Sequence, residues 1–175
     1  VGEYRTRAFT FDGVGVDQLD DINDIACRFA NGYDKTRLRN GAVLGGKYGI
    51  SFDDVGTFNL KCEDFDFFEM QSGCFFDNRT NLPNTDFLHM QWEDCTFRWF
   101  TRYGVEALQG SSFYFTNCII ETCTLGGLYL AGVYFIELTG NHFEQNSPTG
   151  AEYDVDVVVD PTNGANVTKV LRCAG

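Results

Sequence analysis

The feature that most constrains the fold of this chain is a corner that recurs at a nearly constant interval. Asn, Asp and Gly tolerate tight or left-handed backbone geometry, so they mark corners between extended segments. Five such residues recur at intervals of 24, 30, 23 and 23 residues: Asn40, Asp64, Asp94, Asn117 and Gly140. Nine or ten residues after each corner comes a glycine: Gly49, Gly73, Gly104, Gly127 and Gly150. A period of this length is typical of a solenoid.

Apolar side chains keep fixed positions relative to these corners. Two residues before the corner stand Leu38, Cys62, Trp92, Phe115 and Leu138. Four before it stand Thr36, Leu60, Met90, Phe113 and Ile136, and three after it stand Val43, Phe67, Phe97, Ile120 and Phe143. Within each run the spacing is two, which is the period of a β-strand. Three short strands per turn, stacked on themselves, predict an all-β, right-handed parallel β-helix of about five to six coils.

Other solenoids need patterns that this sequence lacks. A helical solenoid would show runs of ten or more residues with a 3.6-residue period, and the segments here are too short and too rich in Gly and Phe. A leucine-rich repeat needs its LxxLxLxxN run, and a left-handed hexapeptide helix needs six-residue repeats. Neither pattern occurs.

The length of 175 residues fits a single domain, which we divide into two parts. We expect residues 1–35 to form an N-terminal strand and a short capping helix, and residues 36–175 to form the coils. The first residue is Val1 and the last coil breaks off, so we expect a mature product or a piece of a longer chain. A cap suits the open end of a solenoid. The helix is predicted from near-helical spacing of Val16, Leu19, Ile22, Ala26 and Phe29.

Four acidic residues lie close together in the predicted capping segment: Asp17, Asp20, Asp21 and Asp24. A calcium loop would need a glycine and a bidentate ligand at set spacing, and both are missing. Negative charge is favoured near a helix N-terminus, so we interpret these residues as a solvated face. His89 and His142 are not placed for a catalytic triad or a metal site. We predict no metal and no cofactor.

The net charge is −12, from 25 acidic and 13 basic residues. Phosphate binding needs a positive surface, so nucleic acid is excluded as a partner. The sequence has no apolar run of 18 residues, so we expect no membrane span. Seven cysteines occur, an odd number, and Cys62 and Cys74 fall in inward columns. We therefore favour reduced thiols in the core, and hence cytosolic synthesis, over a disulfide framework or a zinc site.

A short motif ahead of the coils carries a family resemblance. Asp12-Gly13-Val14, then Asp17, Asp20-Asp21 and Ile22, resembles the DGVTDDTxAI signature of pectate-lyase-like β-helices, which is common in bacteriophage tailspikes. The rhythm of Asn141-x-Phe143-x-x-Asn146 and of residues 127–130 is also similar to those proteins. The resemblance covers roughly residues 12–153. It implies a protein of the phage virion, made in the bacterial cytoplasm, often a homotrimer and often a depolymerase of bacterial surface glycans.

The face that follows the glycines is the predicted site. Its outward positions mix aromatic rings with carboxylates and contain no Lys or Arg. Rings stack on the apolar faces of sugars and carboxylates accept hydrogen bonds from sugar hydroxyls, which suits a neutral or basic glycan; burial against another subunit is the alternative. The expected substrate-binding residues are Phe75, Tyr129, Glu152, Asp154 and Asp53.

Asp77 and Glu106 are the predicted catalytic pair. They lie on adjacent coils at a diagonal of roughly 8 Å, from about 6.8 Å along the strand and about 4.8 Å between rungs. That separation lies in the roughly 6.5–9.5 Å range of inverting glycosidases. Two functions stay open: a glycan depolymerase that hydrolyses with these carboxylates, and a non-catalytic receptor-binding or structural module of a tail fibre. A polysaccharide lyase is a weaker hypothesis, because this face lacks a cation to neutralise a uronate.

Overall fold

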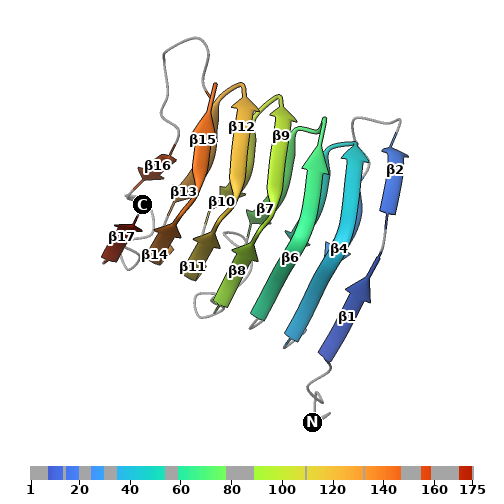
Figure 1. The fold of residues 1–175 in the computed structure, drawn as a ribbon, viewed down its shortest axis with the longest axis horizontal. Helices are drawn as coiled ribbons and strands as arrows, with labels where there is room; N and C mark the ends of the chain where they lie inside the picture. The colour runs from blue at the N-terminus through green and yellow to red at the C-terminus, as the bar shows by residue number, and fades with distance from the viewer. Residues whose placement is uncertain are drawn as a thin grey trace.

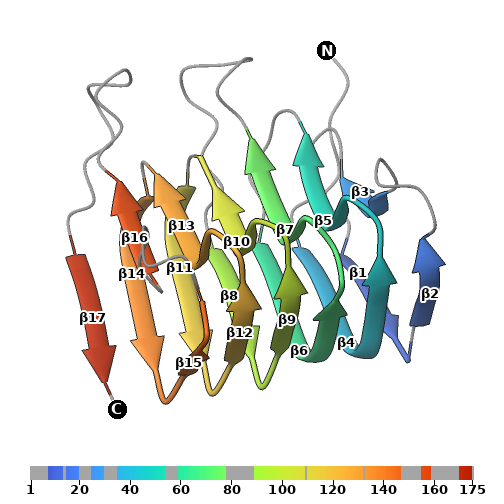
Figure 2. The same cartoon turned by 90° about the horizontal axis from the view of Figure 1, so that it is seen from above.

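The computed structural model describes residues 8–13, 15–19, 25–29, 35–53, 59–77, 89–108, 110–131, 133–146, 155–158 and 170–174. Strands of parallel sheets account for all of the regular secondary structure in these residues. Successive strands lie side by side from the N-terminal to the C-terminal end of the stack (Figures 1 and 2). The chain therefore folds as a parallel β-helix, as predicted. Within its described residues no helix is long and apolar enough to cross a membrane.

The coils form two sheets. The larger sheet has eleven strands: β1 (Ala8–Asp12), β2 (Gly15–Leu19), β4 (Lys35–Gly45), β6 (Asn59–Phe68), β8 (His89–Glu93), β9 (Thr96–Phe100), β11 (Gly110–Thr116), β12 (Ile119–Cys123), β14 (Val133–Thr139), β15 (His142–Glu144) and β17 (Val170–Ala174). The smaller sheet has six strands: β3 (Ile25–Phe29), β5 (Tyr48–Asp53), β7 (Ser72–Asp77), β10 (Tyr103–Ala107), β13 (Gly126–Ala131) and β16 (Val155–Val158). The smaller sheet takes one strand from each successive coil.

The predicted corners are confirmed by the backbone. Each of the five turn residues has a left-handed conformation, with φ of 51° at Asn40, 48° at Asp64, 54° at Asp94, 53° at Asn117 and 64° at Gly140. In β4 and β6 the chain bends at this residue without leaving the strand, whereas in later coils the corner separates two strands. Asn, Asp and Gly adopt this conformation most readily, which explains their recurrence.

A second left-handed corner lies five residues after the first in each of these coils. It is formed by residues that are not turn formers, except in the first of these coils: Gly45, Glu69, Trp99, Thr122 and Gln145. The values of φ at the four other residues are 56°, 63°, 57° and 53°. A bulky or β-branched side chain is an outlier in this conformation. Packing of the coils therefore imposes the second corner on residues that do not favour it.

The interior is a set of stacked columns. The predicted inward positions before and after the first corner are at most 7% exposed, except for Phe143, which is partly buried. Aromatic rings stack on their counterparts one coil away: Trp92 lies 4.5 Å from Phe115 and Phe67 lies 4.9 Å from Phe97, centroid to centroid. Cys62 and Cys74 are fully buried and their burial raises the pKa of each thiol.

Two asparagines fasten the last coils together. The amide oxygen of Asn141 accepts a hydrogen bond of 2.8 Å from the backbone N–H of Cys118, and its Nδ2 donates one of 2.9 Å to the carbonyl of Phe115. Asn146 repeats this arrangement one corner later, on Cys123 and Ile120. These side chains satisfy backbone groups that the corners remove from the sheet ladders, which explains the asparagine rhythm of the sequence.

A glycine column brings neighbouring coils into close contact. A Cβ atom on Gly49 would lie 2.8 Å from the carbonyl oxygen of Gly73. A Cβ atom on Gly73 would lie 2.7 Å from the carbonyl oxygen of Gly104, and one on Gly104 would lie 2.9 Å from that of Gly127. No side chain fits at such separations, so only glycine can occupy these positions.

The predicted N-terminal capping helix is wrong in the part of the segment that the structure describes. Residues 15–19 and 25–29 form the strands β2 and β3, which pair with β4 and β5. The apolar residues that suggested a helix also suit strands, and pairing of β2 and β3 with the first full coil decides between the two structures. Asp17 lies in β2, while Asp20, Asp21 and Asp24 lie outside the described residues.

Candidate functional site

The six-stranded sheet brings three predicted site residues into one column. In the register of its strands, Phe75 of β7 lies beside Glu106 of β10, and Glu106 lies beside Tyr129 of β13. Ser51 of β5 and Asp156 of β16 extend the column at its two ends. We call Phe75, Glu106 and Tyr129 the aromatic face. Its assembly was predicted from the position of each residue relative to the preceding glycine.

Each partly exposed ring of the aromatic face rests on a buried ring. Phe75 stacks on Tyr48 with centroids 4.4 Å apart and planes 7° from parallel. Tyr129 contacts Tyr103 at 5.1 Å with planes 32° apart. Tyr48 and Tyr103 are 8% and 6% exposed, whereas Phe75 and Tyr129 retain intermediate exposure. The buried tyrosines therefore fix the orientation of the rings that a ligand could reach.

Glu106 differs from the prediction in its exposure and its partners. It is only 3% exposed, and its carboxylate accepts hydrogen bonds from Arg102, of 3.1 Å from Nε and 2.7 Å from Nη2. The hydroxyl of Ser72 donates a further bond of 3.2 Å. The expectation of a face without cations is wrong, because Arg102 stands at the corner before β10 and reaches back onto the strand. A buried carboxylate requires such a partner.

The other predicted residues are placed only in part. Asp53 and Asp77 are paired in the register of β5 and β7, and Asp77 lies two residues beyond Phe75, the partner of Glu106. Their side chains are outside the described residues, as are Glu152 and Asp154. The backbone thus agrees with the diagonal expected for Asp77 and Glu106, and the separation of the two carboxyl groups stays a prediction.

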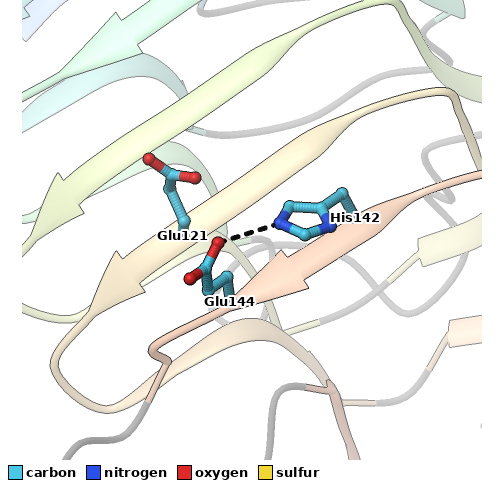
Figure 3. A group of neighbouring side chains, drawn as sticks. All are labelled: Glu121, His142 and Glu144. Carbon is cyan, nitrogen blue, oxygen red and sulfur yellow. Dashed lines mark hydrogen bonds and ion pairs between the residues drawn. The ribbon is translucent and has the colours of Figure 1, made fainter.

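A separate cluster joins Glu121, His142 and Glu144 on the larger sheet. Figure 3 shows His142 and Glu144 on one strand and Glu121 on its neighbour. One potential ligand atom from each residue lies within 4.8 Å of the others, and Nε2 of His142 lies 3.1 Å from Glu144. Imidazole and carboxylate groups suit transition metals. However, Glu121 already forms an ion pair of 2.7 Å with Arg98, so a metal ion would have to displace that partner.

The structure also reveals a groove that the sequence analysis missed. It measures about 390 Å³ and lies across the first strands of the larger sheet, over β1, β4, β6 and β8. Basic side chains reach it from two neighbouring strands. From the sequence alone, the outward residues before the corners, such as Arg37, Lys61, Glu63 and Glu93, indicate only a solvated surface of mixed charge. The groove could not be predicted because Lys35 comes before the aligned positions and Thr10 belongs to the first coil, whose sequence follows the repeat poorly.

Comparison with known proteins supports the fold. Residues 83–169 match the model of a family described as "right handed beta helix region". This match agrees with the hand predicted for the solenoid. No curated protein sequence and no solved structure matches the chain. A right-handed parallel β-helix is compatible with polysaccharide binding.

Proposed function

We propose that this chain binds a bacterial surface polysaccharide along the aromatic face and does not cleave it. The observation that carries the proposal is the pair of partly exposed rings, Phe75 and Tyr129, each held by a buried tyrosine and separated by the strand of Glu106. Two rings fixed two rungs apart, roughly 9.6 Å, suit a ligand with more than one sugar unit. Flat apolar faces pack against sugar rings without a large loss of side-chain freedom.

Arg102 supplies the polar part of this proposed surface. Its side chain is 44% exposed, while the Glu106 side chain that holds it is 4% exposed. A guanidinium has five N–H groups, and Glu106 accepts bonds from two of its nitrogens. The remaining donors are available to sugar oxygens. Glu106 then acts as a positioning residue for Arg102.

Hydrolysis by Asp77 and Glu106 is the second candidate. The backbone diagonal between β7 and β10 favours it, since it is the one expected for an inverting pair. The hydrogen bonds that Glu106 accepts argue against hydrolysis. A general acid must carry and release a proton, and a base must reach a water molecule. Both oxygens of Glu106 instead accept hydrogen bonds from Arg102, and Ser72 adds another. We therefore place binding first.

A panel of bacterial surface polysaccharides tests both candidates. Binding is measured by calorimetry, and cleavage by the appearance of new reducing ends. Replacing Phe75 and Tyr129 together by Ala should weaken binding about tenfold or more, while His142→Ala removes an exposed ring from the larger sheet and should have no effect. Retained binding in the double variant, with an unchanged melting temperature, contradicts the proposed site. New reducing ends that disappear in Glu106→Gln and in Asp77→Asn would favour hydrolysis.

Assembly as a homotrimer in a phage tail belongs to the same proposal. In the described part of the chain the sheets end in β15, β16 and β17 on one side and in β1, β2 and β3 on the other. Unpaired strand edges are aggregation-prone, and proteins cover them with another chain or segment. Light scattering on the chain at micromolar concentration should give three times the monomer mass. A stable monomer would contradict the trimer without affecting the glycan site.

A further inference from the structure

We propose that a divalent transition metal ion binds between Glu121, His142 and Glu144, in place of Arg98, and fastens β15 to β12. We call these three ligands the metal cluster. The sequence alone predicts no metal, because nothing in the spacing shows that Glu121 lies beside two residues of the next coil. The metal cluster belongs to the larger sheet and the aromatic face to the smaller one, so the inference does not rest on the proposed function.

Strand register brings the three ligands of the metal cluster together. Glu121 of β12 lies directly beside Glu144 of β15. His142 comes two residues before Glu144, so both side chains point to the same face of the sheet, where they are 58% and 54% exposed. Figure 3 shows that the three side chains come from two adjacent strands. The sheet therefore fixes their starting points and limits the motion that is needed to surround an ion.

The distances between the ligand atoms are close to those of a metal site. One ligand atom from each residue lies within 4.8 Å of the others, and Nε2 of His142 lies 3.1 Å from Oε2 of Glu144. Bonds of about 2.0–2.1 Å in a tetrahedral zinc site place two ligand atoms roughly 3.3 Å apart. His142 and Glu144 are already at such a separation. Glu121 has to approach by at most about 1.5 Å, which rotation of a surface side chain provides.

The donor set selects the class of ion. It consists of one imidazole nitrogen and two carboxylates. Calcium and magnesium prefer a shell made only of oxygen atoms, in larger number than this cluster offers. Zinc accepts nitrogen and oxygen together, and three protein ligands leave its fourth position to water. We therefore expect zinc, or a transition metal of similar preference, and no calcium.

The charges of the cluster also favour a cation. Glu121 and Glu144 are direct neighbours on adjacent strands, and like charges in that arrangement repel. Arg98 of β9 lies on the other side of Glu121 and offsets one of them. With a neutral imidazole, two carboxylates and one guanidinium leave one negative charge. A divalent ion between the two carboxylates would remove their repulsion.

Arg98 is a weak competitor for Glu121. Its Nε lies 2.7 Å from a carboxylate oxygen of Glu121, yet this nitrogen forms no hydrogen bond within the described part of the chain. The two groups are thus close but poorly aligned, and charge alone holds them together. An ion pair of this kind near the surface contributes little to stability. Metal–carboxylate bonds can therefore replace it at small cost.

The position of the cluster suggests what the metal does. β15 contains only the three residues His142–Glu144, and among the described strands it ends its row and pairs with β12 alone. The inward residue of this strand, Phe143, is only partly buried. A metal ion bound to both strands would hold this short edge strand on the stack. Because the ion binds the folded chain, its binding should raise the melting temperature.

Zinc chloride and the untagged protein provide the test. Calorimetry should show one zinc ion per chain and scanning fluorimetry a higher melting temperature, whereas calcium chloride at the same concentration should do neither. His142→Ala and Glu144→Gln should each weaken zinc binding about tenfold or more. His89→Ala removes the other histidine of the chain, outside the cluster, and should bind zinc like the parent. A cobalt form without thiolate charge-transfer bands would exclude the cysteines as ligands.

Arg98→Gln tests the exchange of partners. Removing the competing cation should strengthen zinc binding about two- to fivefold. Weaker binding in this variant would contradict displacement of Arg98. Absence of binding up to millimolar zinc would overturn the site, and so would equal affinity in the parent and His142→Ala, which means adventitious zinc elsewhere. Melting without metal confirms that each variant is folded. His142→Ala should leave glycan binding unchanged, so this proposal and the proposed function fail separately.

Discussion

The guanidinium of Arg102 holds the carboxylate of Glu106 through Nε and Nη2, at 3.1 and 2.7 Å. The acid is almost fully buried, while the base is about half exposed. Since a buried charge without a partner is strongly unfavourable, the two residues depend on each other unequally.

This inequality predicts the effect of removing either partner. Arg102→Met should lower the free energy of unfolding by about 1–3 kcal/mol, because it leaves the buried carboxylate with Ser72 alone. Glu106→Gln should be milder, because a neutral amide is easier to bury and Arg102 can turn to water. Urea denaturation of both variants measures the difference. Glu106→Gln proving the more harmful of the two would contradict this interpretation of the pair.

Phe115 tests the stacked core. It is fully buried and its ring lies parallel to that of Trp92 one coil away, with planes 6° apart. Phe115→Ala should lower the free energy of unfolding by about 3–5 kcal/mol, since it leaves a cavity in the column. Thr116→Ala, one residue along β11 on the outer side, should cost less than about 1 kcal/mol. Similar losses in the two variants would mean that the column is not the main source of stability.

The second corner predicts a stabilising substitution. Thr122 has φ of 57°, and a β-branched residue is disfavoured there. Thr122→Asn should raise the free energy of unfolding by about 1 kcal/mol, because asparagine tolerates the left-handed conformation. The reverse exchange at the first corner, Asn117→Thr, should lower it by a similar amount. A lower melting temperature for Thr122→Asn would show that contacts of the threonine outweigh the strain of its backbone.

Acid should weaken the ion-pair network that Lys61 forms with Glu63 and Glu93 on the larger sheet. The hydrogen bond from Lys61 lowers the pKa of Glu63 below its ordinary value of 4.5. Stability from this pairing is therefore fully present above pH 4.5 and is lost as the pH falls through the lower value of the folded protein. The side chains are partly exposed, so the contribution should be below about 1 kcal/mol.

Comparison with Glu63→Gln isolates that contribution. Urea midpoints of the two proteins should differ by a constant amount between pH 6 and 8 and converge as the pH drops below 4. A difference that grows on acidification would have the wrong sign for a lowered pKa. High salt should reduce the difference at neutral pH, because it screens exposed charges.

The parts of the fold that the sequence predicted are those where one residue type has one backbone role. Asn40, Asp64 and Asn117 mark the first corner because few other residues adopt its geometry. The second corner gave no such signal, since Trp99 and Thr122 are held there by the coils around them. The helix expected near residues 16–29 failed for a related reason: pairing with β4 and β5 outweighed the local spacing of apolar residues.

The candidate sites were likewise predictable only in part. Alternation along the strands predicted that Phe75, Glu106 and Tyr129 would share a column. It could not predict that Arg102 would cover Glu106, because a long side chain at a corner can turn towards either sheet. The groove over β1, β4, β6 and β8 depends on the packing of side chains across four strands, which appears only in three dimensions. The direction that a long side chain takes, and its contacts across strands, cannot be predicted from the spacing of residues alone.

The glycine column has a consequence for how such a chain can change over time. At Gly49, Gly73 and Gly104 a single methyl group would collide with the backbone of the next coil, so point substitutions there are barred. Removing or duplicating a whole coil keeps the glycines in line and leaves every collision avoided. The number of coils can therefore change in such a fold, whereas the cross-section of each coil is fixed. Relatives of this chain should therefore differ in number of coils more readily than in the residues of that seam.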